Sequence, residues 1–325
     1  MSERVLVFDT TLRDGEQAPG VAFDADAKVE IARALEALGV DVIEAGFPRA
    51  SADAFAAVQA VARAVERPVV AAIACADETD IDHAWQALRD AERPRIHVFT
   101  ATSDVHIEHE LRTTRAGVRE AVGTAIAYAR ERCNDVDCTV ADAPRADVAY
   151  TAEVVELALL EGARTINLAD TVGYATPDEM SGLVSSLHEL VPALREVVLS
   201  VHCHNDLGLA VANTVAGLQA GARQIECSVN GLGERAGNAA LEEVVMLLHT
   251  RRADLGYVTG VDTTHIAHVS HLVTAHSGIA VAANKAVVGA NAFVHSGAIH
   301  RRSMAADRAT YEIMQPETIG RRRAA

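Results

Sequence analysis

Short apolar, β-branched runs alternate along the chain with longer Ala-rich stretches in which apolar residues recur at helical spacing. Eight such strand-and-helix units can be counted. The predicted strands are residues 5–8, 42–45, 69–73, 96–100, 137–140, 165–168, 197–202 and 224–229. Predicted helices between them include residues 25–38, 52–64, 116–130, 177–190 and 209–220.

Residues at several joints agree with these boundaries. Gly39 and Gly221 follow predicted helices, where a left-handed C-cap favours glycine. Pro177, directly after Thr176, suits the first position of a helix because no hydrogen bond is lost there. Eight parallel crossovers predict an α/β fold closed into a (β/α)₈ TIM barrel. A doubly wound open sheet is the alternative, which eight evenly spaced units disfavour.

The alternation of predicted strands and helices ends near the C-terminus. A histidine-rich helix is predicted over residues 263–277, followed by a Gly-, Ala- and Asn-rich segment over 278–300. We therefore predict a barrel domain over residues 1–252 and a short, mainly helical appendage or lid over 253–325.

Composition narrows the functional classes. A formal net charge of −16 argues against binding to nucleic acid or to an anionic membrane surface, since both require a basic field. No apolar run approaches the roughly 18 residues of a membrane span, so a soluble, cytoplasmic protein is expected. The five scattered cysteines include no CxxC pair, which indicates reduced thiols.

Polar and ionisable residues gather directly after the predicted strands, where a TIM barrel carries its active site. Side chains alternate along a strand, so His202 and His204 are expected on one side, with Cys203 on the other. Asp14 follows the first strand and could supply a third ligand. Two imidazoles and a carboxylate suit Zn²⁺, Mn²⁺, Mg²⁺ or Fe²⁺. The alternative is a buried ion-pair cluster of these residues with Arg13.

Three long sequence blocks occupy the ends of the first, seventh and eighth predicted strands. They read DTTLRDG at residues 9–15, HCHNDLG at 202–208 and NGLGERAGNA at 230–239. Through them the chain resembles the DRE-TIM metallolyase family, and it is most similar to the 2-isopropylmalate synthases, with homocitrate synthases next. The likeness extends over nearly the whole chain through INLADTVGYATP (166–177), NKAVVGANAF (284–293) and YEIMQPETIG (311–320).

The resemblance implies roles for particular residues. The implied metal ligands are Asp14, His202, His204 and Asn238. The implied catalytic residues are Arg13, which faces the reacting oxygen, and His300 and Tyr311, which transfer protons. The implied substrate-binding residues are Gln17, Glu44, His97, Thr139, Asn167, Ala169 and Thr171.

The resemblance also implies an activity. It is the condensation of acetyl-CoA with a 2-oxo acid, followed by thioester hydrolysis, to give a 2-alkylmalate. A divalent cation is expected as cofactor, namely Mg²⁺, Mn²⁺ or Zn²⁺, with Fe²⁺ and Co²⁺ as further candidates. Members of the family are usually dimers whose C-terminal segments cross to the partner. A homodimer is therefore expected, with His300 serving the other subunit's site.

Several positions depart from the family pattern. Ala141 stands where these synthases usually carry a glutamate, and Ala169 is closer to the homocitrate type. The tail block HSGAIHRRS (295–303) keeps both usual histidines but gains Arg301 and Arg302. We hypothesise that the arginines contact an anionic group, either on a dicarboxylic or phosphonate acceptor or on a CoA phosphate. The alternative is that they face solvent without a ligand.

Two other functional classes remain open, a retro-aldol lyase of the same superfamily and a non-catalytic metal-binding scaffold. A synthase releases thiol from acetyl-CoA only when a 2-oxo acid is present. A lyase would produce a short fragment without it, and a scaffold would do neither. The tail blocks between residues 284 and 320 favour the synthase.

Overall fold

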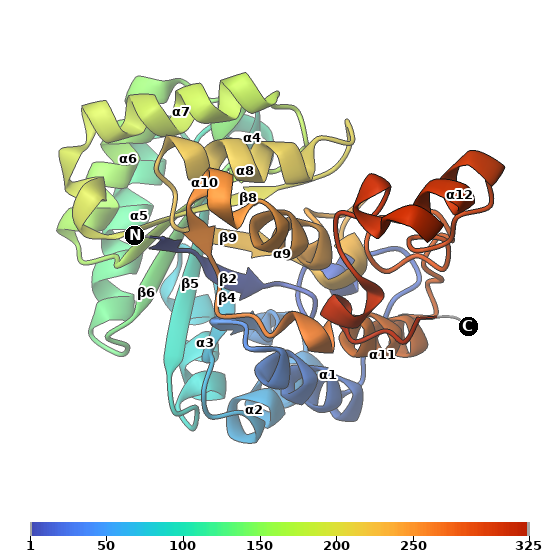
Figure 1. Cartoon of the computed structure of the whole chain (residues 1–325). Helices are drawn as coiled ribbons and strands as arrows, with labels where there is room; N and C mark the ends of the chain where they lie inside the picture. Colours follow the sequence, from blue (N-terminus) through green and yellow to red (C-terminus); the bar gives the residue numbers. More distant parts are fainter. Residues whose placement is uncertain (1, 324–325) are drawn as a thin grey trace.

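The computed structural model describes residues 2–323 and contains a closed barrel of eight parallel strands arranged in chain order (Figure 1). The strands are β2 (Leu6–Asp9), β3 (Val42–Glu44), β4 (Val69–Cys75), β5 (Pro94–Ala101), β6 (Val136–Ala141), β7 (Thr165–Asp170), β8 (Val198–Cys203) and β9 (Gln224–Cys227). Because β2 pairs with both β3 and β9, the sheet has no free edge. The predicted TIM barrel is confirmed, and an open doubly wound sheet is excluded.

A helix follows each barrel strand and packs on the outside of the barrel. These helices are α1 (Ala25–Leu38), α2 (Ala52–Ala64), α3 (Glu78–Leu88), α5 (Arg115–Arg130), α6 (Val148–Leu160), α7 (Pro177–Leu190), α8 (Ala210–Ala220) and α9 (Leu241–Thr250). Their ends follow local chemistry. Thr176 and Glu179 form a capping box at the start of α7, and Gly39 ends α1 in the left-handed region.

The barrel interior is divided into two halves of different polarity. Phe8, Val42, Val69 and Ala71 form a small apolar cluster inside β2, β3 and β4. On β5 to β9, buried polar residues alternate with apolar residues of the larger core. The buried polar residues nearest the amino ends of these strands are Arg95, Asp137, Thr165, Ser200 and Gln224. Alternate side chains face opposite sides of a strand, so these polar side chains point into the barrel while their apolar neighbours face the surrounding helices. This half of the barrel interior is therefore polar, from the amino ends of the strands up to their carboxyl ends.

Short elements complete the fold. Strand β1 (Glu3–Arg4) pairs with β10 (Tyr257–Val258), and α4 (Asp104–His109) lies in the connection between β5 and α5. Helix α10 (Arg252–Leu255) follows α9 directly. The five cysteines are free thiols, in agreement with their predicted reduced state. Among the described residues, no helix is both long enough and apolar enough to cross a bilayer.

The C-terminal part is helical, as predicted. Helix α11 (Ile266–Ser277) packs beside α1, whereas α12 (Ala298–Ala306) lies farther out, beyond α11 (Figure 1). We call residues 279–323 the C-terminal arm. Several of its apolar side chains are exposed, namely Ile279, Val294, Ile299, Tyr311 and Ile313. The boundary placed between residues 252 and 253 stays a prediction.

Two glycine positions should respond oppositely to alanine. Gly39 has φ 90°, and a Cβ there would lie 2.8 Å from the carbonyl oxygen of Gly260. We expect Gly39→Ala to lower the free energy of unfolding by more than about 1 kcal/mol. Gly182, in α7, has open space around its Cα. Gly182→Ala should raise stability by roughly 0.5 to 1 kcal/mol, because alanine favours the helix.

Chemical denaturation of both variants and the wild type measures these changes. Destabilisation by Gly182→Ala, or no loss in Gly39→Ala, would contradict the packing described for these helix positions.

Candidate active site

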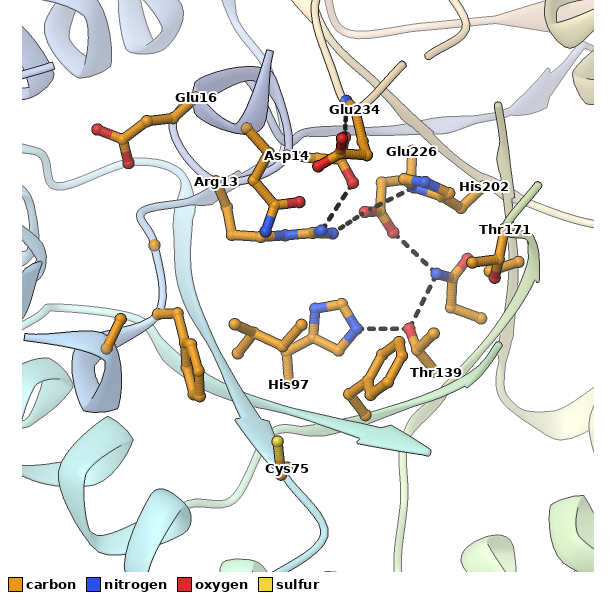
Figure 2. Close-up of a pocket in the computed structure, with 18 of the residues that line it drawn as sticks. Arg13, Asp14, Glu16, Cys75, His97, Thr139, Thr171, His202, Glu226 and Glu234 are labelled. Atoms are coloured by element: carbon orange, nitrogen blue, oxygen red, sulfur yellow. Dashed lines mark hydrogen bonds and ion pairs between the residues drawn. The ribbon is translucent and has the colours of Figure 1, made fainter. Parts of the chain in front are cut away.

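A pocket of about 550 Å³ opens at the carboxyl ends of the barrel strands (Figure 2). Ten of the residues predicted from the sequence line it, namely Arg13, Asp14, Gln17, His97, Thr139, Asn167, Ala169, Thr171, His202 and His204. Two more lie directly behind the lining. Glu44 contacts Arg13, and Asn238 contacts Asp14. Strand ends far apart in the sequence therefore deliver most of the predicted residues to one place.

Asp14, His202 and His204 converge closely enough to hold one cation. Each offers a ligand atom, and these atoms all lie within 4.8 Å of one another. All three residues are buried, and the Nε2 atom of His204 is 3.6 Å from the Oδ2 atom of Asp14. Strand β8 carries His202 near its end, and an isolated bridge pairs His204 with Asn238 just beyond it.

The protonation states of Asp14 and His204 suit a cation, whereas His202 must lose a proton to bind one. Burial would lower the pKa of His202, but Glu226 outweighs burial and raises it. Burial would raise the pKa of Asp14, but the charges of Arg13 and His202 outweigh burial and hold that pKa below its usual range. Burial and the neighbouring His202 lower the pKa of His204 to about 3. An anionic carboxylate thus lies beside a neutral imidazole, which is the form in which histidine binds metal ions.

Asn238 lies beside these three residues and contacts Asp14. Its Nδ2 atom donates to Oδ1 of Asp14 at 3.0 Å and to the carbonyl oxygen of Leu232 at 2.9 Å. Its Oδ1 atom is buried and has no hydrogen-bond partner among the described residues, and the same holds for Nδ1 of His204. A buried amide oxygen without a partner is costly unless a ligand satisfies it. A mixed nitrogen and oxygen set of this kind fits a divalent cation.

Arg13 is surrounded by three buried carboxylates. Its Nε atom donates to Glu44 at 2.6 Å, Nη1 to Asp14 at 2.8 Å, and Nη2 to Glu226 at 3.2 Å. Burial would lower the pKa of Arg13, but these carboxylates raise it further above its usual value. The guanidinium is therefore a fixed positive charge at the edge of the candidate metal site (Figure 2).

The floor of the pocket is a closed ring of polar side chains contributed by five strands and the loop after β2. In order, the ring members are Arg13, Glu44, His97, Thr139, Asn167 and Glu226. The Nδ1 atom of His97 lies 2.8 Å from Glu44, and its Nε2 atom bonds to the hydroxyl of Thr139. The amide of Asn167 donates both to Thr139 at 2.9 Å and to Glu226 at 2.8 Å.

Glu226 was not predicted from the sequence, although its carboxylate connects the candidate metal site to the polar ring. Its carboxylate is 1% exposed and contacts Arg13, Asn167 and the Nδ1 atom of His202, the last at 2.9 Å. The available signal was an acidic residue inside the predicted buried strand 224–229. A carboxylate in that position is buried only when it is paired, so it could have been predicted to face the site.

The rest of the pocket combines a hydroxyl with an apolar wall. The Thr171 hydroxyl accepts a hydrogen bond from the backbone N–H of Asp142 at 2.8 Å, which leaves its own proton free to donate. The apolar lining comprises Gly46, Phe47, Ala50, Ala54, Ile73, Phe99 and Ala169. Ala141 is fully buried and is not part of the lining.

The predicted residues of the C-terminal arm lie outside this pocket. His300 and Tyr311 stack on each other with ring centroids 3.8 Å apart, and both are exposed. Arg301 and Arg302 are exposed on α12. None of the four belongs to the pocket lining of the described chain. Their roles in proton transfer and anion contact therefore stay predictions.

Comparison with known proteins gives the family. The HMGL-like family profile matches residues 4–273, and that of the homocitrate synthase post-HMGL domain-like family matches residues 287–325. The chain therefore belongs to the HMGL-like family, which confirms the resemblance to the DRE-TIM metallolyases seen in its sequence. Close curated relatives are named 2-isopropylmalate synthases. Those of Methylobacterium nodulans and Pelotomaculum thermopropionicum are 51% identical over 319 residues and 50% identical over 320 residues.

Each match covers 98% of this chain but only 61% and 63% of the relative, so the chain spans less than two thirds of their length. Among solved structures, the HMG-CoA lyase of Bacillus subtilis superposes with a TM-score of 0.75 at 20% identity. That match covers 88% of this chain and 97% of the lyase. At this identity the likeness bears on the fold alone.

The charge of His97 should make stability depend on pH. Burial would lower its pKa, but Glu44 and Asp137 outweigh burial and raise it to about 9. A raised pKa contributes stability that is complete below the unfolded value of about 6.5 and is lost as pH rises through about 9. Between pH 6 and pH 10, wild-type unfolding free energy should fall relative to His97→Gln by on the order of 3 kcal/mol.

Urea denaturation of both proteins across this pH range measures the difference. His83→Gln, which changes a partly exposed histidine on α3 outside the ring, serves as the control and should follow the wild type. Parallel curves for wild type and His97→Gln would show that the ring does not hold His97 in its cationic form.

Proposed function

We propose that the protein is a divalent-metal-dependent acyltransferase that condenses acetyl-CoA with a 2-oxo acid, as a 2-isopropylmalate synthase does. The observation that carries this proposal is the convergence of Asp14, His202 and His204 on one point beside Arg13. The names of relatives at about half identity support the same reaction. Water then hydrolyses the thioester, so the products are a 2-alkylmalate and free CoA thiol.

Asp14, His202, His204 and Asn238 would hold the cation, because they offer carboxylate, imidazole and amide donors in one buried place. When bound, the cation would polarise the carbonyl of the 2-oxo acid and orient that substrate. Glu226 lies 2.9 Å from Nδ1 of His202 and so fixes that ring's orientation. Mg²⁺, Mn²⁺ and Zn²⁺ are the proposed ions, with Fe²⁺ and Co²⁺ as further candidates.

Arg13 would share the negative charge that develops on the former carbonyl oxygen as the carbon–carbon bond forms. Its three carboxylate partners hold the guanidinium in place, so little reorganisation is needed during the reaction. The hydroxyl of Thr171, whose proton is free, would donate a hydrogen bond to the carboxylate of the 2-oxo acid. Together these two groups fix the acceptor at its carboxylate and at its reacting oxygen.

The apolar wall suggests what the acceptor carries. Phe47, Ile73 and Phe99 lie on the pocket lining. An apolar side chain on the 2-oxo acid would bury surface against them. A dicarboxylic or phosphonate acceptor would instead require a cation without a carboxylate partner. Lys28 and Arg235 line the pocket but are paired with Glu16 and Asp206. Arg301 and Arg302 could supply such a charge only from another position of the arm. We therefore propose an apolar 2-oxo acid, with a homocitrate-type or phosphonate acceptor as the alternative.

We propose that proton transfer by His300 and Tyr311 requires a second copy of the chain. Both residues are exposed on the C-terminal arm, together with Ile299 and Ile313. Exposed apolar side chains that cluster on one projecting segment are typical of an interface. A homodimer with exchanged arms would cover them and place His300 at the partner's pocket, where it could remove a proton from the methyl group of acetyl-CoA.

A thiol-release assay tests the reaction. With Mn²⁺ and acetyl-CoA, we expect thiol release only when a 2-oxo acid is added, and faster for 2-oxoisovalerate than for 2-oxoglutarate. Removing metal with a chelator should abolish turnover, and added Mn²⁺ should restore it. Cleavage of a 2-alkylmalate or an acyl-CoA without a 2-oxo acid would indicate a lyase, and no turnover in any condition would leave only a metal-binding scaffold.

Arg13→Ala tests the proposed charge stabilisation. Removing one preorganised donor to a developing oxyanion typically costs about 10² to 10³ in rate, so kcat should fall by at least that factor. Divalent binding, measured by calorimetry, should weaken but remain detectable, because Arg13 is not a ligand although it helps to keep Asp14 ionised. Arg119→Ala, which removes a surface ion pair with Glu153, is the matched control and should keep wild-type turnover. An unchanged kcat in Arg13→Ala would refute the role.

A further inference from the structure

The loop after β9 lies against the candidate metal site at two points. The backbone N–H of Glu234 donates to Oδ1 of Asp14 at 3.1 Å, and the side-chain amide of Asn238 donates to the same oxygen at 3.0 Å. We call residues 228–240 the metal-site loop. Any shift of this loop would move a candidate ligand, Asn238, and two donors that orient another ligand, Asp14.

Two non-glycine residues of the metal-site loop have a left-handed backbone conformation. Asn230 and Arg235 adopt positive φ angles of 61° and 55°. Gly231, Gly233 and Gly237 also have positive φ angles, which glycine adopts without steric cost. A non-glycine residue in this region of backbone space is held there by surrounding contacts. The loop therefore depends on anchors from outside.

The strongest anchor is Asn230, which is held on two sides. Its side chain exchanges hydrogen bonds with Ser270 of α11, accepting from the hydroxyl at 2.6 Å and donating to the carbonyl at 3.1 Å. Its backbone N–H donates to Oε2 of Glu242 at 3.0 Å. Glu242 belongs to the first turn of α9 and is only 1% exposed. A buried carboxylate of this kind needs a counter-charge to remain in place.

Lys285, from the C-terminal arm, supplies that charge. Its Nζ atom lies 3.4 Å from Oε1 of Glu242 and 2.6 Å from Oε1 of Glu243. The turn that presents Lys285 is firmly docked, because Val287 and Val288 are buried and Arg321 donates to the carbonyl oxygen of Gly289 at 2.8 Å. Lys285 thus lies near the start of the C-terminal arm and contacts Glu242, whose carboxylate accepts the hydrogen bond from Asn230.

We propose that Lys285 is a positioning residue for the metal site. Its ion pair fixes Glu242, Glu242 fixes Asn230, and Asn230 sets the loop that presents Asn238 and the Glu234 N–H to Asp14. Docking of residues 285–289, at the start of the C-terminal arm, is therefore coupled to the protein's affinity for the cation. Lys285 itself contacts neither the cation nor the pocket. This inference rests on the proposed metal-dependent function.

Calorimetric titration of metal-free protein with Mn²⁺ tests the coupling. Lys285→Met keeps the length of the aliphatic stem and removes the charge. Loss of a contact behind the ligands typically weakens metal affinity about 10- to 100-fold, so the Kd of this variant should rise by at least about tenfold. Glu243→Gln keeps the ion pair between Lys285 and Glu242, so its Kd for Mn²⁺ should stay within twofold of the wild-type value. Arg322→Met, which removes an exposed arm charge, should do the same.

A matched set of variants separates positioning from general stability. Gly162→Ala forces a side chain onto a residue with φ 105° in the turn between α6 and β7, away from α9 and α11. It should melt at lower temperature yet bind Mn²⁺ with wild-type affinity. The double variant Lys285→Met/Glu242→Gln removes the unpaired buried charge and should recover folding, while its Mn²⁺ affinity stays weak. Hydrogen exchange over residues 228–240 should be faster in Lys285→Met than in Gly162→Ala.

Two results would overturn the coupling. One is a Lys285→Met variant that binds Mn²⁺ within twofold of wild type, and the other is a double variant with restored affinity, which would show that only the unpaired charge mattered. A wild-type protein that binds no divalent cation is a different outcome, because it would refute the proposed function itself.

Discussion

The site depends on the buried guanidinium of Arg13, which lies among the carboxylates of Asp14, Glu44 and Glu226. Three carboxylates close together in a barrel interior would repel one another and lose hydration, and one of them would take up a proton. Arg13 keeps Asp14 in the anionic form needed to bind a cation. It also ties Glu44 and Glu226 into the ring that forms the pocket floor. Removing one partner of such a buried group typically costs about 3 to 5 kcal/mol.

The barrel makes this charge arrangement possible. Parallel strands bring their carboxyl ends to one rim, so residues more than 200 positions apart, such as Arg13 and Glu226, come within hydrogen-bond distance. The polar half of the interior continues below the ring through Asp137 and Arg95, whose side chains lie 3.8 Å apart. Asp137 helps to raise the pKa of His97. Phe8 and Val42 fill the opposite half of the barrel interior with apolar side chains.

Much of the fold could be predicted from the sequence because strand and helix periodicities repeat with little interruption. The predicted helices 25–38, 52–64 and 177–190 match the structure at both ends, since Asp24, Ser51 and Thr176 each cap a helix start with a side chain. Asp14, His202 and His204 could be predicted to converge, because strand ends meet at the rim. Glu226 was missed because its partners come from other strands. The Lys285 contact was equally hidden, since it joins the arm to a helix 42 residues earlier.

Asp14, His202 and His204 are proposed to hold a divalent cation beside Arg13. Anomalous diffraction from crystals grown with Mn²⁺ would locate that cation. We expect one strong peak within about 2.3 Å of a carboxylate oxygen of Asp14 and of one nitrogen from each histidine. Active protein whose crystals show no peak at these three side chains, or a peak bound elsewhere, would contradict this proposal.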